Sequence, residues 1–417
     1  MTVNRPETAA GATGGRMDCF ESIRGLAAFA VLLGHLIIAF WSHLYVMGPA
    51  QPGAPFSLIR AAARTPLRVL WEAQWAVSTF FVLSGFVLTL SYFRSGRQAT
   101  MSSAAVRRYF RLMIPAAASI LFAYVLLKCG WMYNRAAVAY LDGAAPSAHW
   151  WLNLFYNFKP SFRVALKDCF WTTFFGNGSL YNQNLWTMPV ELQGSFLVYT
   201  FAVLFGKLRN RWLVYSALSF ILVCTNQLFM LNFVLGVVLA DAFVWAEKRE
   251  WRRGMPWPLA ALVVLGAVYL GTLRPTSPIS FHWLKLERMA VYQSIASFLL
   301  VGAVAFSPVL RRLLEVRVMR FLGGISFGLY LIHLPVLCSL GVGAFVVVHY
   351  NLGWSYNACA LCAAAATIST SIVLAWAFHR WIDQPAIWVC KLLYSKVFEA
   401  RPAAVPAAAA PALSRAA

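Results

Sequence analysis

Ten apolar stretches, most of them long enough to cross a lipid bilayer, limit what this sequence can fold into. They occupy residues 20–41, 71–92, 112–130, 184–206, 212–226, 228–246, 257–273, 289–307, 321–340 and 357–379, of which the fifth and seventh are short. A transmembrane helix needs about 20 apolar residues and satisfies its own backbone groups in hydrocarbon. Apolar residues make up 60% of the chain and charged residues 12%, against about 25% charged residues in soluble domains. We therefore predict an all-α, polytopic transmembrane helical bundle of about ten spans.

The basic residues between these stretches indicate how the spans are oriented. If the N-terminus is cytoplasmic, the cytoplasmic segments hold 23 Lys and Arg residues and the opposite side holds 11, with Arg24 inside the first span. Cytoplasmic loops of membrane proteins carry such an excess. We expect an integral, multi-pass protein with both termini cytoplasmic. The net charge of +21 arises from these short clusters, so nucleic acid is not an expected partner.

The two ends of the chain differ in composition from the apolar middle. Residues 1–17 and 396–417 are rich in Ala, Pro and Gly, and we predict that they are disordered around a membrane domain at residues 18–395. The connection 131–183 contains the aromatic stretch HWWLNLFYNF and a sequon at Asn177. Such a stretch is typical of a segment lying along the membrane surface, on the outer side in this topology. The CxxC at Cys359 has no second pair, which favours helix packing over a metal site.

Two ionisable residues in the first span stand out. Arg24 lies near the start of the apolar run and His35 near its middle. Ionisable groups in hydrocarbon are costly and by default indicate function. Eleven residues at about 100° each bring both side chains to nearly the same helix face, roughly 16 Å apart along the axis. Neutral imidazole is well matched to removing a proton from a hydroxyl near pH 7, so His35 is a candidate catalytic base.

Three arginines precede the apolar part of the third predicted span. Arg107, Arg108 and Arg111 lie within the segment RRYFRLMIP, and Arg108 and Arg111 share a helix face. Arginine pairs bidentately with phosphate oxygens, which favours a phosphate clamp for a charged nucleotide such as coenzyme A. The alternative is a set of topology anchors without further function.

Other polar groups lie inside later apolar stretches. Glu191 needs a partner if it is buried, and Arg24 or a histidine would serve; structural pairing and catalytic assistance are equally open. His333 lies mid-span, with Ser326 and Tyr330 at helical spacings before it. The Ser84–Gly85 pair favours close helix packing. Asp383 precedes a proline near the cytoplasmic surface, where helix termination is the ordinary explanation.

Together these segments resemble the acyltransferase-3 family of integral-membrane O-acyltransferases. The family's motifs lie in the family's order at Arg24 and His35, Phe80 to Phe86, Arg107 to Pro115, Leu185 to Glu191, Ser326 to His333, and Asp383 with Pro385. The terminal motif reads Asp-Gln-Pro where bacterial members commonly have Glu-Arg-Pro. That variant, with no fused SGNH hydrolase-like domain, is more similar to eukaryotic, especially fungal, members.

The resemblance implies transfer of an acyl group, most often acetyl, from acyl-CoA to a hydroxyl of a carbohydrate, glycolipid or secondary metabolite. It implies acyl-CoA as a donor substrate rather than a permanently bound cofactor, membrane lipids as surroundings, and no metal. Its implied catalytic residues are His35, Glu191 and His333. Its implied donor-binding residues are Arg24, Arg107, Arg108 and Arg111. The rival interpretation is a proton-coupled transporter or flippase in which the intramembrane Arg, His and Glu residues line a pathway.

Overall fold

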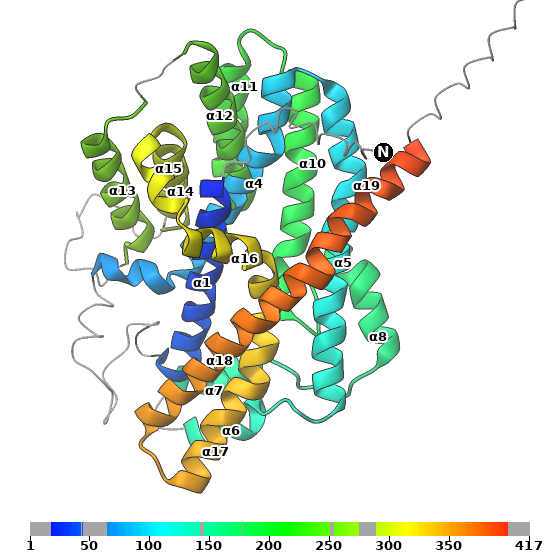
Figure 1. Cartoon of the computed structure of the whole chain (residues 1–417), viewed down its shortest axis with the longest axis vertical. Coiled ribbons are helices and arrows are strands. Elements are labelled where there is room, and N and C mark those ends of the chain that lie inside the picture. The colour runs from blue at the N-terminus through cyan, green and yellow to red at the C-terminus, as the bar shows by residue number, and fades with distance from the viewer. Residues whose placement is uncertain are drawn as a thin grey trace, which may run out of the picture.

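The described part of the chain is built from helices. A computed structural model describes residues 18–42, 44, 65–141, 146–176, 178–250, 254–274 and 289–398, and within these ranges it contains no strand. The longer helices are α1 (Asp18–Phe40), α4 (Ala73–Ser95), α5 (Gln98–Lys128), α10 (Thr187–Phe205), α11 (Arg211–Cys224), α12 (Leu228–Lys248), α13 (Trp257–Thr272), α14 (Met289–Phe306), α16 (Arg317–Val336), α17 (Val342–Leu352), α18 (Tyr356–Phe378) and α19 (Gln384–Phe398). Their arrangement is shown in Figure 1. The predicted all-α class is confirmed.

The ten predicted spans each correspond to an apolar helix. Eight helical segments of the described residues are long and apolar enough to cross a membrane. The other two are the shorter α11 and α13, which the sequence also predicted to be short. The protein is thus an integral multi-pass helical bundle. The predicted ends 1–17 and most of 396–417, together with Asn177, lie outside the described residues.

Three helical segments run further than the apolar pattern predicted. α5 begins at Gln98, ahead of the apolar stretch 112–130, and the arginine motif lies inside this helix, as the predicted shared helix face of Arg108 and Arg111 requires. α16 continues through a π-helical turn, Leu337–Gly341, into α17. α18 continues through a second π-helical turn, His379–Asp383, into α19. The prediction that the chain ends a helix at Pro385 is therefore wrong. A proline ring clashes with the carbonyl four residues earlier in an α-helix, and the wider π-helical turn just before Pro385 leaves room for it.

Close backbone approaches hold the centre of the bundle together. α1 packs along α16 and α4, and α4 packs along α12. A Cβ atom added to Gly25 would lie 2.5 Å from the carbonyl carbon of Leu322, and one added to Gly323 would lie 2.6 Å from that of Glu21. Gly85 likewise faces the backbone of α12, as the small-residue pattern predicted. Small residues allow the backbones to touch, which sets the register between α1 and α16.

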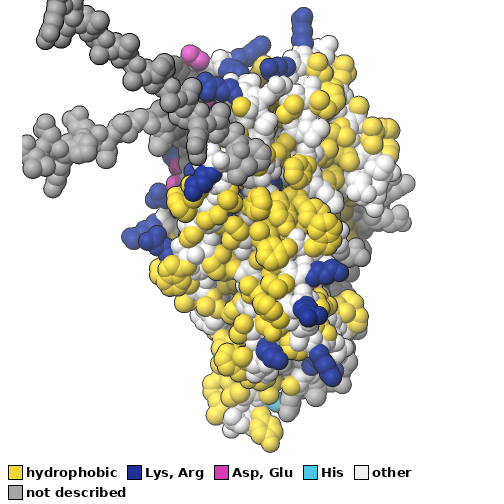
Figure 2. Space-filling view, turned by 90° about the vertical axis from the view of Figure 1, so that its right-hand side faces the viewer, with side chains coloured by type: hydrophobic (Ala, Val, Ile, Leu, Met, Phe, Trp, Pro, Cys, Tyr) yellow, Lys and Arg dark blue, Asp and Glu magenta, His cyan; other side chains and the backbone are white. Residues whose placement is uncertain are grey.

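The outer surface is apolar, as a lipid-facing surface requires. Apolar side chains cover most of the face shown in Figure 2. Large exposed side chains occur on several of the spanning helices; examples are Leu204, Phe220, Leu265, Val373 and Trp388. Because lipid tails are apolar, such exposure carries no cost in a bilayer.

The long connection between α5 and α10 folds into short helices. These are α6 (Asn134–Leu141), α7 (Pro146–Asn153), α8 (Phe162–Lys167), a π-helical turn η2 (Asp168–Thr172), α9 (Thr173–Phe175) and a 3-10 turn η3 (Gln183–Trp186). Neighbouring residues of the aromatic stretch face different surroundings: Trp150 is 65% exposed whereas Trp151 is buried. α7 packs against α1. The connection therefore contributes side chains to the interior as well as to the surface.

Candidate active site

Two histidines from helices far apart in sequence meet in the bundle. Nδ1 of His35, on α1, lies 2.9 Å from Nε2 of His333, on α16, and the two rings stack with centroids 5.1 Å apart. His333 is 1% exposed, while His35 is only partly buried. The contact depends on the glycine-mediated approach of α1 and α16. The structure thus brings together two of the three predicted catalytic residues.

The hydrogen bonds of this pair determine which nitrogen carries each proton. Nδ1 of His333 lies 2.8 Å from the carbonyl oxygen of Leu329, one helical turn earlier. Because a carbonyl only accepts, Nδ1 of a neutral His333 carries the hydrogen and its Nε2 carries the lone pair. His35 must then donate from Nδ1, which leaves the lone pair of His35 on Nε2. Among the described residues, no hydrogen bond to this Nε2 is formed. Nε2 of His35 is therefore able to accept a proton.

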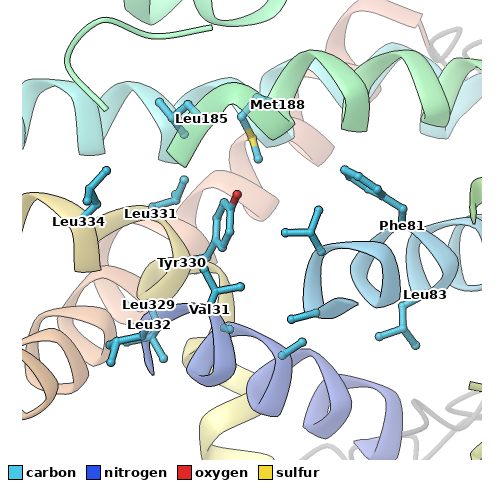
Figure 3. Close-up of a cluster of buried hydrophobic side chains, with 14 of the residues drawn as sticks. Val31, Leu32, Phe81, Leu83, Leu185, Met188, Leu329, Tyr330, Leu331 and Leu334 are labelled. Carbon is cyan, nitrogen blue, oxygen red and sulfur yellow. The ribbon is translucent and has the colours of Figure 1, made fainter. Parts of the chain in front are cut away.

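The turn η3 supports the histidine pair from the side. Nδ2 of Asn184 lies 3.2 Å from Nε2 of His333 and donates to it. The Tyr330 hydroxyl donates to the carbonyl oxygen of Asn184 at 2.9 Å and lies 2.9 Å from the Thr187 hydroxyl. In Figure 3 the Tyr330 hydroxyl points toward the helix that carries Met188. These bonds dock the start of α10 onto the middle of α16.

An aromatic side chain of the long connection also packs against His35. The Trp151 ring lies with its centroid 5.3 Å from that of His35, and Phe155 packs edge-on against Trp151. Trp151 is 8% exposed. His35 therefore contacts one imidazole and one indole, which restricts its ring orientation.

A pocket of about 410 Å³ opens beside this centre, between α1, α4, α5, α10, α16 and the turn before α19. Its charged lining residues are Asp18, Glu21, Arg24, Arg108, Arg111, Glu191, Arg320 and Asp383. Its apolar wall includes Phe80, Leu88 and Phe327. Tyr330 and Thr187 also line it, and the Tyr330 ring centroid lies 6.1 Å from that of His333. Tyr330 therefore lies where the charged pocket meets the histidine pair.

Glu191 is paired inside this pocket, but with a different partner than predicted. Its Oε1 accepts from the Ser84 hydroxyl at 2.7 Å and from Nη2 of Arg108, while Nε of Arg108 donates to the Ser195 hydroxyl at 2.7 Å. The expected partners, Arg24 or a histidine, do not contact it among these bonds. The reason is tertiary: α5 and α10 pack side by side, which brings Arg108 to Glu191. Among the residues that the structure describes, no hydrogen bond or ion pair joins Glu191 to the histidine pair.

The other two arginines of the motif diverge. Nη1 of Arg111 donates to Oδ1 of Asp383 at 2.7 Å, and Nδ1 of His379 lies 3.2 Å from Oδ2 of the same carboxylate. Arg107 is not among the residues that line the pocket. Its Nε donates to the Ser103 carbonyl oxygen, and its guanidinium lies over the Tyr394 ring. The structure therefore puts Arg108 and Arg111, but not Arg107, at the pocket.

Arg24 reaches the pocket with a looser partner. Its Nη1 lies 3.9 Å from Oε1 of Glu21, and the side chain is 32% exposed. Arg24 lines the pocket while His35 does not, so the two residues of the first span serve different regions. No group of three or more His, Cys, Asp or Glu side chains suited to a metal occurs in the part of the chain that the structure describes.

Several residues of the site went unrecognised in the sequence. Asn184, Trp151 and Arg320 contact the histidine pair or line the pocket, yet none was a candidate. For Asn184 a signal existed: an amide in YNQNLW, directly before an apolar span, is a costly residue near hydrocarbon. Arg320 looked like one more basic anchor at a helix start. Trp151 lies in the aromatic stretch that was predicted to lie along the membrane surface, so it was not expected in the interior.

Comparison with known proteins identifies related chains. A family profile described as the acyltransferase domain (Acyl_transf_3) matches residues 17–376. An O-acetyltransferase of Phomopsis amygdali is 23% identical, over 90% of this chain and 84% of its own length. An acyltransferase of Phoma sp. is 24% identical, over 79% of this chain and 82% of its own length. Another acyltransferase, from Cochliobolus lunatus, is 24% identical over 69% and 72% of the two chains. No solved structure matches significantly.

Proposed function

Because this chain belongs to the acyltransferase family whose profile spans residues 17–376, we propose that it is a membrane O-acetyltransferase that uses acetyl-CoA as the donor. The relatives are fungal, as the resemblance predicted, and one is named an O-acetyltransferase. The observation that carries the proposal is the histidine pair, since it leaves one imidazole nitrogen of His35 with a lone pair. Tyr330 connects this pair to the arginine-rich pocket, because it lines the pocket and its ring centroid lies 6.1 Å from that of His333.

In the proposed reaction His35 acts as general base. Nε2 of His35 takes the proton of the acceptor hydroxyl while that oxygen attacks the thioester carbonyl carbon. The carbon–sulfur bond then breaks, and the imidazolium returns a proton to the departing thiolate. His333 holds the Nδ1 hydrogen of His35 throughout, so it is a positioning residue that favours the correct tautomer and stabilises the transient positive charge.

The donor would bind through the charged pocket. Coenzyme A carries several phosphate charges that cannot enter hydrocarbon, and guanidinium groups pair well with phosphate oxygens. Arg24, Arg108 and Arg111 line this pocket. The pantetheine arm would extend past the apolar wall toward Tyr330, so that the thioester arrives beside the histidine pair. Acetyl-CoA is a substrate in this scheme, and no permanently bound cofactor takes part.

The acceptor in this proposal is a hydroxyl compound, either a carbohydrate, a glycolipid or a secondary metabolite. Trp151 favours a ring-shaped acceptor, because an aromatic face beside His35 packs well against the apolar face of a ring. Membrane lipids surround the bundle, and nucleic acid has no part in the proposed reaction.

The proposed topology has both termini cytoplasmic, with the arginine-lined pocket open to the cytoplasm where the donor is found. The excess of basic residues on that side supports it. Labelling of single cysteines introduced into the 131–183 connection tests it: a membrane-impermeant reagent should react from the outer side. Reaction from the cytoplasmic side alone would invert the topology.

The activity itself is tested with purified protein in phosphatidylcholine nanodiscs. With acetyl-CoA and a panel of hydroxyl acceptors we expect CoA release that depends on the acceptor. The alternative, a proton-coupled transporter or flippase, predicts substrate movement in proteoliposomes without any consumption of acetyl-CoA. That second result would overturn the proposal.

A further inference from the structure

The pocket contains two kinds of arginine–carboxylate pair. Arg108 with Glu191 and Arg111 with Asp383 make direct hydrogen bonds, and the two carboxylate side chains are only 10% and 8% exposed. The other two pairs are more open. Nη1 of Arg24 lies 3.9 Å from Oε1 of Glu21, and Nη1 of Arg320 lies 3.8 Å from Oδ2 of Asp18.

The two open pairs lie on one structural unit. Arg24 is next to Gly25, and Gly25 contacts the backbone of Leu322, two residues after Arg320. Both arginines line the same pocket, from the touching helices α1 and α16. Their side chains are 32% and 52% exposed. The close helix contact therefore presents two accessible guanidinium groups from one rigid support.

The two kinds of pair differ in what a ligand would have to break. A separation of 3.8 or 3.9 Å is longer than a hydrogen bond, and exposed ion pairs contribute little to stability. Removing the partner of a buried charge is costly, by contrast, because the remaining charge stays desolvated. An incoming anion thus replaces Glu21 and Asp18 far more easily than Glu191 and Asp383.

We propose that Arg24 and Arg320 together bind the phosphate groups of the donor, and that Glu21 and Asp18 are exchangeable partners which the phosphates displace. Arg108 and Arg111 then keep the pocket in shape rather than bind the donor directly. This inference rests on the proposed function, since it takes coenzyme A as the ligand. Arg320 becomes a donor-binding residue outside the recognised motifs. The two carboxylates compete with the phosphates for the arginines and so lower the affinity for coenzyme A.

The first experiment measures CoA binding by isothermal titration in phosphatidylcholine nanodiscs, which offer no anionic lipid to occupy the arginines. Arg320→Gln should weaken CoA binding about tenfold or more, because a charge-assisted hydrogen bond to phosphate is lost. Arg317→Gln is the matched control: it lies three residues earlier on α16, is exposed and does not line the pocket. Equal affinity of the two variants would overturn the proposal.

The carboxylates provide a test of opposite sign. Glu21→Gln and Asp18→Asn should each tighten CoA binding roughly two- to fivefold, since an exposed competing charge is removed. Glu315→Gln, an exposed carboxylate on the loop before α16, should leave it unchanged. If Glu21 and Asp18 only favour the N-terminus of α1 electrostatically, both substitutions will lower the thermal midpoint and leave CoA affinity unaltered, which contradicts the exchange.

Comparing CoA with dephospho-CoA shows which phosphates are bound. A similar loss in Arg320→Gln for both ligands assigns the pair to the diphosphate, and a loss for CoA alone assigns it to the 3′-phosphate. Failure of the inference is distinguishable from failure of the proposed function. If wild-type protein binds no CoA at all, the proposed donor is wrong; if it binds CoA and Arg320→Gln binds equally well, only the assignment of the arginine pair is wrong.

Discussion

The middle and the end of the helix pair α1–α16 are built from opposite kinds of contact. In the middle, His35 is hydrogen-bonded to His333, and His333 is hydrogen-bonded to the uncharged partners Leu329 and Asn184. At the end, Arg24 and Arg320 lie near carboxylates beyond hydrogen-bonding distance. The hydrogen bonds in the middle fix one orientation of the two rings, whereas the charges at the end have partners that a ligand can replace.

This difference matches what each region has to do in an acyltransferase. Proton transfer requires a lone pair that points in one direction, and hydrogen bonds from a helix carbonyl through two rings supply it. Binding and releasing a charged donor requires partners that exchange at little cost. In the proposed reaction, a single pair of helices joined at Gly25 and Gly323 would supply both.

Replacing the base should separate the two regions most sharply. His35→Ala should lower kcat by about three orders of magnitude or more, because general base catalysis contributes a factor on the order of 10² to 10⁴. The substitution also removes the ring against which Trp151 packs. CoA affinity should change little, since the pocket does not include His35. Single-turnover transfer and CoA titration on the same preparation check this. Wild-type transfer by His35→Ala would make the imidazole a packing residue.

The positioning role of His333 predicts the next largest effect. His333→Leu removes the acceptor for the Nδ1 hydrogen of His35 and should lower kcat about a hundredfold at unchanged CoA affinity. His333→Gln offers an amide oxygen in its place and should recover much of that loss. A purely structural role predicts instead that both variants lose expression and CoA binding together.

Substitution in the directly hydrogen-bonded pair Arg108–Glu191 should change the stability of the protein more than substitution in an open pair does. Glu191→Gln leaves Arg108 buried without a countercharge and should destabilise the protein by about 3 kcal/mol. Glu21→Gln, in an exposed pair, should cost less than about 1 kcal/mol. Thermal unfolding of the two purified variants makes the comparison. Equal midpoints would remove the distinction between tight and open pairs.

The smallest expected effect concerns the contact that joins the two regions. Gly323→Ala adds a methyl group where a Cβ would lie 2.6 Å from the Glu21 backbone, which should cost about 1 to 3 kcal/mol. Gly324→Ala is the neighbouring control, because its nearest heavy atom outside the helix is Nε2 of His379, at 3.8 Å. Thermal midpoints of both variants measure the effect. A control that is as destabilised as Gly323→Ala would point to helix propensity or general crowding rather than to this contact.

Much of the fold was readable because the membrane imposes a local rule. Each span must be apolar and helical on its own, so the ten helices follow from runs of residues without knowledge of their neighbours. The boundaries were less predictable. The extensions of α16 and α18 depend on π-helical turns, and no run of apolar residues signals a change in helix winding.

For the site, the sequence by itself determined which residues were exceptional: an arginine and a histidine in the first span, a glutamate in the fourth, a histidine in the ninth. Ionisable groups in hydrocarbon are rare enough to be recognised individually. Only the tertiary structure decided their partners. His35 meets His333, Glu191 meets Arg108, and Arg320 joins the pocket, because helix packing joins distant parts of the chain: His35 and His333 are 298 positions apart. Pairing depends on which helices touch and in which register, and that information is distributed over the small residues of many helices at once.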